Sequence, residues 1–590
     1  MRRFTVPSLL MVFFYLYFSE QVCPSFYFWD SAELTAAVLG NGVPHPPGFP
    51  FFLILSNLWL ILFGTSGSGV VAGYNNAHLL NLFSAFFAAL GLALWYAVIV
   101  RIIAELNINK NRFISEFIAS IVVMILGISF SFGIQATRFE VYSLNFVGYA
   151  ALMLVALKIA ESDNAPFWWS LLLFLGIGLF LGVHSLTIAL AVPGILLIPL
   201  IKGRIKPKYI LAGMPLSLAI MMVAYLAILF RAGQMPDLNW GYPSNLSKLW
   251  DCILLKGFQP SGATLTLSHL ISNLTFVLDL FIRQFGLLSL LFCLWGFLFM
   301  ILRQFKIGAP LLIILLMNML STLLSKEFFY ENYDLHGYLL LSMALISLGL
   351  AVSLTLLFNA AKIRLEMANK RYSFAPAFAV TALAILILFA GPFRQNLYSA
   401  DLSNNDDAYR YAENYLVDMP DSSIVITSSF NTYFTLLAYA NINHNHGWPK
   451  IINLYHWDQD WGKELTNDQF GITLKTNYKL PFYYRNFINS TMNRYKLFIE
   501  YDQASVSAVN FLKPDGYRYY FTFDSLYNNT WNFGILQAEI MKASYSAEIE
   551  NIRTHLLWFK NRADYYERIG ADSISVKYLN ILDPLVNILN

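Results

Sequence analysis

The stretch WDSAELTAAVLGNGVPHPPGFPFF, residues 29–52, lies between long apolar segments and carries acidic residues followed by a proline-rich turn. Its D-x-x-E spacing before an apolar run predicts a capping box, in which Asp30 and Glu33 bond the first free amides of a short helix. Gly40 is the expected end of that helix, and His45 opens the turn behind it. A capped helix is a rigid support, so the same stretch also suits a reactive carboxylate.

Composition indicates the class of protein around this stretch. Of the 590 residues, 57% are hydrophobic and 13% are charged, and this charged share is about half that of a soluble domain. The net charge of +3 comes without a basic block, so no nucleic-acid partner is expected. The three cysteines are far apart and form neither a disulfide framework nor a metal knuckle. The sequence is that of a polytopic membrane protein embedded in a lipid bilayer.

Runs of about 20 apolar residues predict eleven transmembrane spans. We read the first as an uncleaved span and not as a signal peptide, because no small-residue cleavage site follows it. The apolar segment 49–63 is too short for a span and predicts an interfacial or re-entrant helix. The predicted spans lie near residues 5–22, 78–100, 113–132, 143–160, 167–183, 186–201, 209–230, 285–302, 309–325, 338–358 and 374–392.

Loop charges orient these spans. Lysine and arginine are concentrated in the loops on the side of the N-terminus, which places the N-terminus in the cytoplasm and the C-terminus outside. Residues 1–392 are expected to form a transmembrane domain, whose first outer loop covers residues 24–77. Residues 393–590 hold no spanning run and are expected to form a soluble extracytoplasmic domain of α/β or mostly helical type.

Local patterns predict some elements of this second domain. The segments SSIVITS (422–428) and RYKLFIEY (494–501) predict buried strands, the first of them followed by a helix. The tail from Asn532 to Asn590 has the apolar spacing of helices.

Unusual polar residues of the membrane part fall almost entirely on the outer side in this topology. Ionisable residues at membrane depth are costly and indicate function by default. Their convergence on one side predicts an outward-facing polar cavity. The candidates are Asp30, Glu33, His45, Arg138, Glu140, His184, Arg231, Asp334 and His336.

Structural alternatives stay open for each candidate. Arg138 and Glu140 fit a local ion pair, and His184 fits a histidine at a helix end. Arg231 fits an interfacial anchor whose stem lies along apolar surface. The two candidates after residue 330 fit ordinary loop residues.

Glycosyl transfer from a lipid-phosphate donor suits an outward cavity beside an interfacial helix. The acceptor hydroxyl must lose a proton as it attacks the anomeric carbon, so one carboxylate acts as general base. The leaving phosphate needs cations or hydrogen-bond donors, which Arg138, Arg231 and the histidines supply. A divalent metal is compatible with this chemistry, but no set of ligands at metal spacing indicates one.

A family resemblance rests on the acidic first-loop motif, HPPGFP, QATRFEVYSLN, GLFLGVHSLT and RAGQMPDLNWGYPSNL. Together these segments resemble the GT-C superfamily of membrane glycosyltransferases and, more narrowly, its protein O-mannosyl-transferase-like family. The resemblance covers about residues 25–445. It implies a bundle of about eleven transmembrane helices in a bacterial inner membrane. It further implies a polyprenyl-phosphate-sugar donor and an acceptor presented outside, a protein serine or threonine.

Residue roles follow from the same resemblance. Asp30 matches the first-loop base, Glu33 is its neighbour, and Glu140 matches a second acidic position. Asn239 and Trp240 lie in a strongly matching segment and are expected to bind substrate with the other candidates. Two segments depart from the family pattern: SSFNTYF (428–434) lacks the usual acids, and YENYDLHGY lacks a Leu-Pro step.

Other functions remain open at this point. The acceptor can instead be a glycolipid or a surface polysaccharide. A transporter or flippase would show broken helices in two corresponding halves and polar residues at the midplane, which the sequence does not suggest. A catalytically inactive scaffold is a third class.

Overall fold

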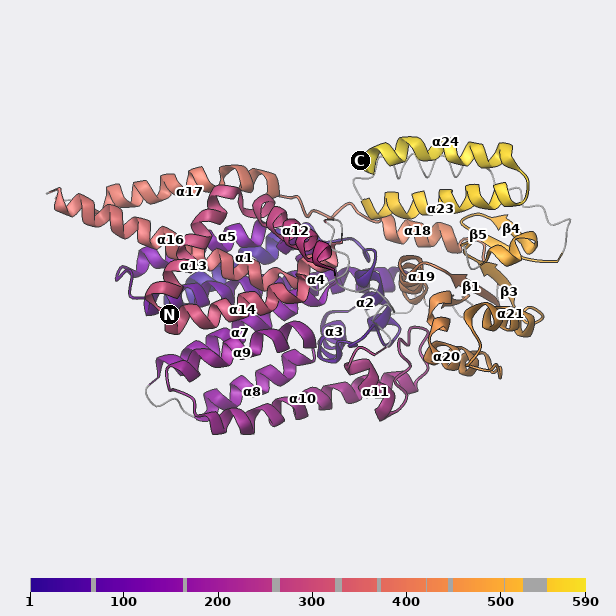
Figure 1. The fold of residues 1–590 in the computed structure, drawn as a ribbon, viewed down its shortest axis with the longest axis horizontal. Coiled ribbons are helices and arrows are strands. Elements are labelled where there is room, and N and C mark those ends of the chain that lie inside the picture. The colour runs from indigo at the N-terminus through magenta and orange to yellow at the C-terminus, as the bar shows by residue number, and fades with distance from the viewer. Residues whose placement is uncertain are drawn as a thin grey trace.

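Long apolar helices form the larger part of the molecule (Figure 1). The computed structural model describes residues 2–64, 70–162, 167–256, 266–323, 330, 332–368, 373–420, 422–443, 449–502, 505–523 and 549–589. Within these ranges six helices are long and apolar enough to cross a membrane. They are α4 (Val70–Glu105), α7 (Val141–Glu161), α10 (Pro207–Gly233), α14 (Phe305–Leu323), α16 (Leu340–Met367) and α17 (Phe374–Asn396).

Two further spans are bent. If each bent pair is one span, the described part of the chain holds up to eight. The first pair, α5 (Arg112–Ile128) and α6 (Phe130–Ala136), bends by 70°; the second, α12 (Leu267–Phe285) and α13 (Leu287–Arg303), bends by 104°. Gly286, with φ 78°, occupies the second bend, a conformation that glycine adopts at little cost.

Shorter apolar helices occupy the other predicted spans. They are α1 (Arg2–Ser19), α8 (Phe167–Leu181) and α9 (Ser185–Ile201), while α3 (Pro50–Phe63) is the short helix expected beside the first outer loop. The expectation of a polytopic helical bundle is therefore confirmed. The count of eleven spans is compatible with this structure and stays a prediction.

Close helix packing centres on α16, which is buried along most of its length. Its Gly349 faces Gly296 of α13 so closely that a Cβ on Gly296 would lie 1.9 Å from the Gly349 carbonyl oxygen. Small residues that let two backbones approach are the usual device of membrane helix packing. The helices α4 and α7, α9 and α14, and α1 and α4 also pack in pairs around this centre.

A mixed α/β domain follows the bundle, and we call residues 407–589 the C-terminal domain. Its sheet has the order β2-β1-β3-β5-β4, with β1 parallel to β2 and β3. The strands are β1 (Ser423–Thr427), β2 (Lys450–Asn453), β3 (Lys496–Ile499), β4 (Leu512–Asp515) and β5 (Arg518–Phe521). The two predicted strands are thus confirmed as β1 and β3, and the helix expected after β1 is α19 (Phe430–Asn443).

Helices cover both faces of this sheet (Figure 1). The predicted helical tail is confirmed for residues 549–589, whereas residues 532–548 lie outside the described ranges. The covering elements are α18 (Asp407–Leu416), α20 (Asp460–Phe470), α21 (Leu480–Thr491), α23 (Ile549–Arg568), α24 (Asp572–Leu589) and the 3-10 turns η1 (Leu454–Asp458) and η2 (Val506–Phe511).

One hydrophobic core continues from the bundle into the C-terminal domain. The joint is α19, which packs against α2 (Asp30–Leu39) and α4. The short helix α11 (Leu246–Ile253) lies at the same end of the bundle (Figure 1), and a second short helix, α15 (Tyr333–Tyr338), packs against α6 and α14. The domain is therefore fixed over the loop that carries residues 29–52.

The predicted capping box is wrong. The N-cap of α2 is Trp29, with φ 57°, and no side chain caps the helix there. Glu33 accepts the backbone N–H of His45 instead of turning back to the start of the helix. The expected end is confirmed, because Gly40 is the C-cap and donates its N–H to the Ala36 carbonyl at 2.9 Å.

Candidate active site

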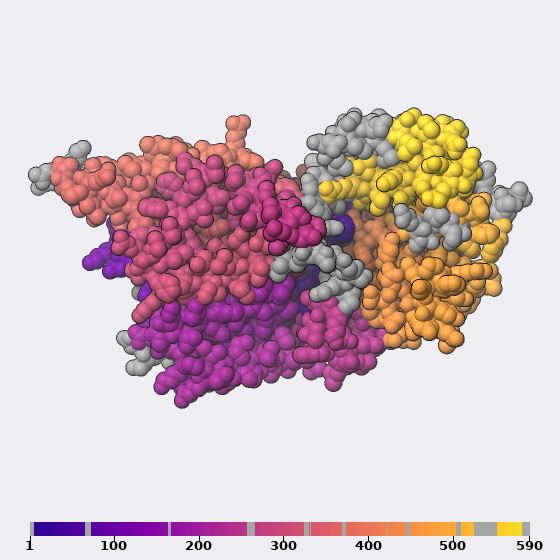
Figure 2. Space-filling model, viewed as in Figure 1, coloured from indigo at the N-terminus to yellow at the C-terminus, as the bar shows by residue number. Residues whose placement is uncertain are grey.

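A cavity of about 1270 Å³ lies between one end of the bundle and the C-terminal domain. The space-filling view shows the bundle and the C-terminal domain as two masses side by side (Figure 2). We call the cavity residues from the bundle the bundle wall, and those from the C-terminal domain the domain wall. Six of the eleven candidates line the bundle wall, namely Asp30, His45, Arg138, His184, Trp240 and Asp334.

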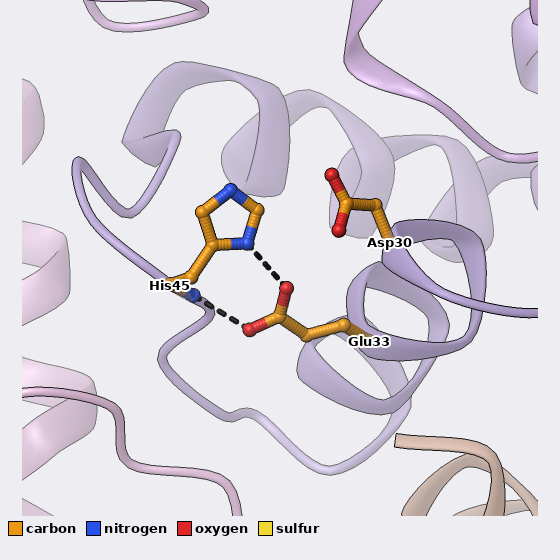
Figure 3. Close-up of side chains that lie close together, drawn as sticks. All are labelled: Asp30, Glu33 and His45. Carbon is orange, nitrogen blue, oxygen red and sulfur yellow. Dashed lines mark hydrogen bonds and ion pairs between the residues drawn. The ribbon is translucent and has the colours of Figure 1, made fainter. Parts of the chain in front are cut away.

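Glu33 holds His45 in place at the bundle wall. One oxygen of the buried Glu33 carboxylate accepts the backbone N–H of His45 at 2.7 Å, and the other forms an ion pair with His45 Nδ1. The imidazole lies against Phe49, with ring centres 5.0 Å apart. Asp30 stands free of this pair, with its carboxylate beside the imidazole (Figure 3). Glu33 itself does not line the cavity, so it acts through His45.

The surroundings shift the pKa values of Asp30 and His45. Burial and the Asp334 carboxylate raise the pKa of Asp30 to about 7, against the opposing effect of His45. Burial lowers the pKa of His45, but the Glu33 and Asp30 carboxylates outweigh it and raise the pKa to about 9. At neutral pH the imidazole is therefore a cation, and the Asp30 carboxyl is close to half ionised, which is the range that suits a general base.

A second charged group completes the bundle wall. The Arg138 guanidinium donates to Asp334 at 2.6 Å and pairs with Glu140 at 3.5 Å. It also lies over the Tyr27 ring, 5.5 Å from the ring centre. The pKa of Glu140 stands well above its usual range because the carboxyl is buried. The local ion pair expected from the sequence is present, but the closer partner of Arg138 comes from residue 334.

Among the described residues, two sets of side chains could hold a divalent cation. Asp30, Glu33 and His45 form one set, and Asp30, Glu140 and Asp334 the other, with ligand atoms within 4.8 Å of one another in each. Carboxylate oxygens and imidazole nitrogens are suitable ligands for such ions. The sequence spacing did not reveal these sets, because their members are brought together only by folding.

His184 reaches the cavity as a neutral group. Its Nδ1 lies 3.0 Å from the Thr187 hydroxyl, and its ring packs against Tyr142 and Tyr338. Burial, with the nearby His45 cation, lowers its pKa to about 3. His184 thus offers a hydrogen bond and no charge.

Three candidates support the walls from behind and do not line the cavity. Arg231 is buried and donates to the carbonyl oxygens of Ala37 and Gly42, both at 3.0 Å, which fixes the loop after α2. Asn239 donates to the Ala232 carbonyl and forms a β-bridge with Val43.

His336, the third of them, is fully buried. Its Nδ1 lies 2.9 Å from the Ser131 hydroxyl and its Nε2 lies 2.8 Å from the Tyr330 carbonyl oxygen. Both ring nitrogens are therefore used in packing α15 against the bundle.

Comparisons with known proteins show which folds and families this chain resembles. Two solved structures of ArnT from Cupriavidus metallidurans share the fold. One, bound to undecaprenyl phosphate, has a TM-score of 0.50 at 10% identity and covers 89% of this chain and 99% of its own. The other, in the apo state, has a TM-score of 0.54 at 9% identity, and the match covers 87% of this chain and 97% of that structure. The family described as Protein O-mannosyl-transferase TMEM260 N-terminal domain matches residues 30–208.

These findings support a GT-C, protein O-mannosyltransferase-like protein. They favour an integral membrane glycosyltransferase of the GT-C type over the transporter alternative. No curated protein matches the sequence closely enough to count as a relative. The family match begins at Asp30, the first residue of α2.

Sequence reasoning missed several residues of this GT-C cavity. Trp29 precedes Asp30 and lines the cavity, and its N–H donates to the Asn431 side chain of the C-terminal domain at 3.0 Å. The domain wall adds His456 and Trp461, among others. The available signal was the density of aromatic residues in LYHWDQDW (454–461), which is unusual in a polar domain.

Proposed function

We propose that this GT-C protein transfers a sugar from a polyprenyl-phosphate donor to a serine or threonine hydroxyl of a protein. The reaction takes place outside the cytoplasm, at a bacterial inner membrane, with the N-terminus of the chain in the cytoplasm. The observation that carries the proposal is the Asp30 carboxylate, which faces the cavity between the His45 cation and the Arg138 guanidinium.

The chemistry assigns a role to each group. Asp30 takes the proton of the acceptor hydroxyl as its oxygen attacks the anomeric carbon of the donor. The bond between that carbon and the phosphate oxygen breaks, and the electron pair leaves with the lipid phosphate. His45 is placed to stabilise the negative charge on the leaving group, and Arg138 adds a second cation. Glu33 keeps the imidazole protonated and oriented.

A lipid-phosphate donor has independent support. The ArnT structure that shares this fold was solved with undecaprenyl phosphate. The apolar helix α3 begins directly after HPPGF and is half-exposed along its outer face, which suits a lipid tail beside the cavity. The Arg138 and His45 cations, both at the cavity, match a phosphate head group.

Substitution of Asp30 tests the assignment. We expect Asp30→Asn to lower sugar transfer in proteoliposomes by at least about 100-fold, the usual contribution of a general base. Thermal stability should change little, because Asp30 makes no capping hydrogen bond that the change would remove. Asp279→Asn is the matched control, since Asp279 is an exposed carboxylate of α12.

Retained transfer in Asp30→Asn would overturn the base assignment. The acceptor is identified separately, by comparing intact masses of the cell's glycoproteins with and without the gene. A change in glycolipid or polysaccharide alone would replace the protein acceptor.

A further inference from the structure

The cavity is larger than a donor head group needs. Small-molecule sites occupy about 300–1000 Å³, whereas this cavity measures about 1270 Å³. The domain wall of this cavity contributes residues from α19, η1, α20 and α23. A second substrate therefore has room beside the donor.

An unbroken series of rings leads from the catalytic residues to the domain wall. The His45 ring lies 6.4 Å from that of Trp240, and the Trp240 ring lies 6.1 Å from that of Trp461. The His456 ring lies between the two tryptophans, with its centre 4.7 Å from that of Trp240 and 4.8 Å from that of Trp461. The Phe430 ring centre lies 5.1 Å from that of Trp240. We call these five residues the aromatic strip, and all of them line the cavity.

One polar atom of the strip is unsatisfied. His456 is 7% exposed, and its Nε2 has no hydrogen-bond partner among the described residues. Burial lowers its pKa to about 3, so the ring is neutral and its Nε2 can make one hydrogen bond. A buried polar nitrogen without a partner needs an explanation, and at the wall of a cavity a bound molecule is one.

The surface of the strip suits a side chain of the polypeptide acceptor proposed above. The ring faces of the strip suit an apolar side chain, and His456 Nε2 suits one backbone group. Tryptophan faces in a partly enclosed pocket are typical anchoring points for such side chains.

We propose that the aromatic strip selects the acceptor, by binding an apolar or aromatic side chain of an extended polypeptide. The two steps from His45 to Trp461 correspond to at most about four residues of extended chain. The bound side chain thus lies within about four residues of the serine or threonine that receives the sugar. This inference rests on the proposed function and adds the sequence preference of its acceptor.

Paired peptides test the preference. One peptide carries tryptophan or leucine within four residues of a single serine, and its twin carries glycine there. We expect the wild-type enzyme to show a KM at least about tenfold lower for the apolar peptide. Trp461→Ala should remove that difference, and Trp461→Phe should keep part of it. Hydrolysis of the donor without acceptor should be unchanged in both variants.

Phe482→Ala is the matched control, because Phe482 is an exposed ring of α21 outside the cavity, and it should keep the full preference. Thermal unfolding confirms that each variant is folded. Equal KM values for the two peptides in the wild-type enzyme overturn the role of the strip and leave the proposed function standing. So does a loss of donor hydrolysis in Trp461→Ala, which would assign the strip to the donor.

Failure of the proposed function looks different. If the wild-type enzyme consumes donor but glycosylates neither peptide, the protein acceptor itself is wrong. If an oligosaccharide accepts the sugar and Trp461→Ala raises its KM, the strip is a glycan platform and the peptide inference is overturned.

Discussion

The two walls of the cavity differ in how their charged groups are held. The bundle wall carries His45, which is paired with the buried Glu33 behind it, and Arg138, which is paired with Asp334. The domain wall presents rings beside polar residues, and its buried carboxylate, Glu500, is occupied by the start of α19. In the proposed reaction, bond making is concentrated on the wall that the membrane helices fix, while the wall from the attached domain is suited to choosing a partner.

Breaking the charged wall should have the largest effect on stability. Arg138→Ala leaves the Glu140 and Asp334 carboxylates facing each other without a cation. We expect a loss of about 3–5 kcal/mol in the free energy of unfolding, as for other buried pairs that lose one partner. Denaturation in detergent measures it. Arg101→Ala removes an exposed pair with Glu161 and should cost no more than about 1 kcal/mol.

Comparable losses in the two variants would contradict the view that the Arg138 cluster is a buried structural unit. They would also weaken the contrast between the walls.

Substitution of Glu33, the partner of His45, should have an intermediate effect, which is seen in the pH dependence of kcat/KM. Transfer requires ionised Asp30 and protonated His45, so kcat/KM should be highest between about pH 7 and pH 9. In Glu33→Gln the cation loses its partner, so the alkaline limb should move toward the ordinary histidine pKa of 6.5. We expect activity at pH 8 to fall by about 10- to 100-fold.

The raised pKa of His45 also determines how the stability of the fold depends on pH. The folded pKa of His45 lies above its ordinary value, so the pair stabilises the fold fully below about pH 6.5 and stops doing so as pH rises through about 9. An alkaline limb that stays in place in Glu33→Gln would show that His45 is not the group that titrates.

Substitution of Glu500 in the domain wall should have the smallest effect on stability and activity. Glu500 accepts the N–H groups of Ser428 and Ser429 at 2.7 and 3.0 Å, directly before α19. Glu500→Gln should cost about 1 kcal/mol, the usual value of a charge and cap at a helix start, and leave donor hydrolysis unchanged. Thermal unfolding measures the first and phosphate release the second. Glu413→Gln, an exposed change on α18, is the control. A large loss of hydrolysis would place Glu500 among the reacting groups.

Hydrophobic patterns predicted the fold because they are local. The apolar runs that marked the spans coincide with helices, and SSIVITS forms β1 because its five strand residues are all buried. The site was predicted in part, since Asp30 and His45 lie in one short stretch. The partnership of Arg138 with Asp334 joins residues 196 positions apart, and no local spacing contains it.

The capping box failed for a related reason. D-x-x-E satisfies the local pattern, but Glu33 gains more from the His45 cation than from a helix amide, and Trp29 takes the N-cap position instead. Trp461 was missed because the sequence of a polar domain does not indicate which of its rings will face another domain.

The hydrogen bond from the Trp29 N–H to Asn431 has a practical consequence for anyone recombining these enzymes. Trp29 has a backbone conformation that bulky residues avoid, and the residue bonded to it is Asp30. The C-terminal domain thus helps to hold the backbone next to the proposed base, and it is not an exchangeable attachment. A chimera that replaces the domain must supply an acceptor oxygen at the place of Asn431, or the peptide before Asp30 loses its hold.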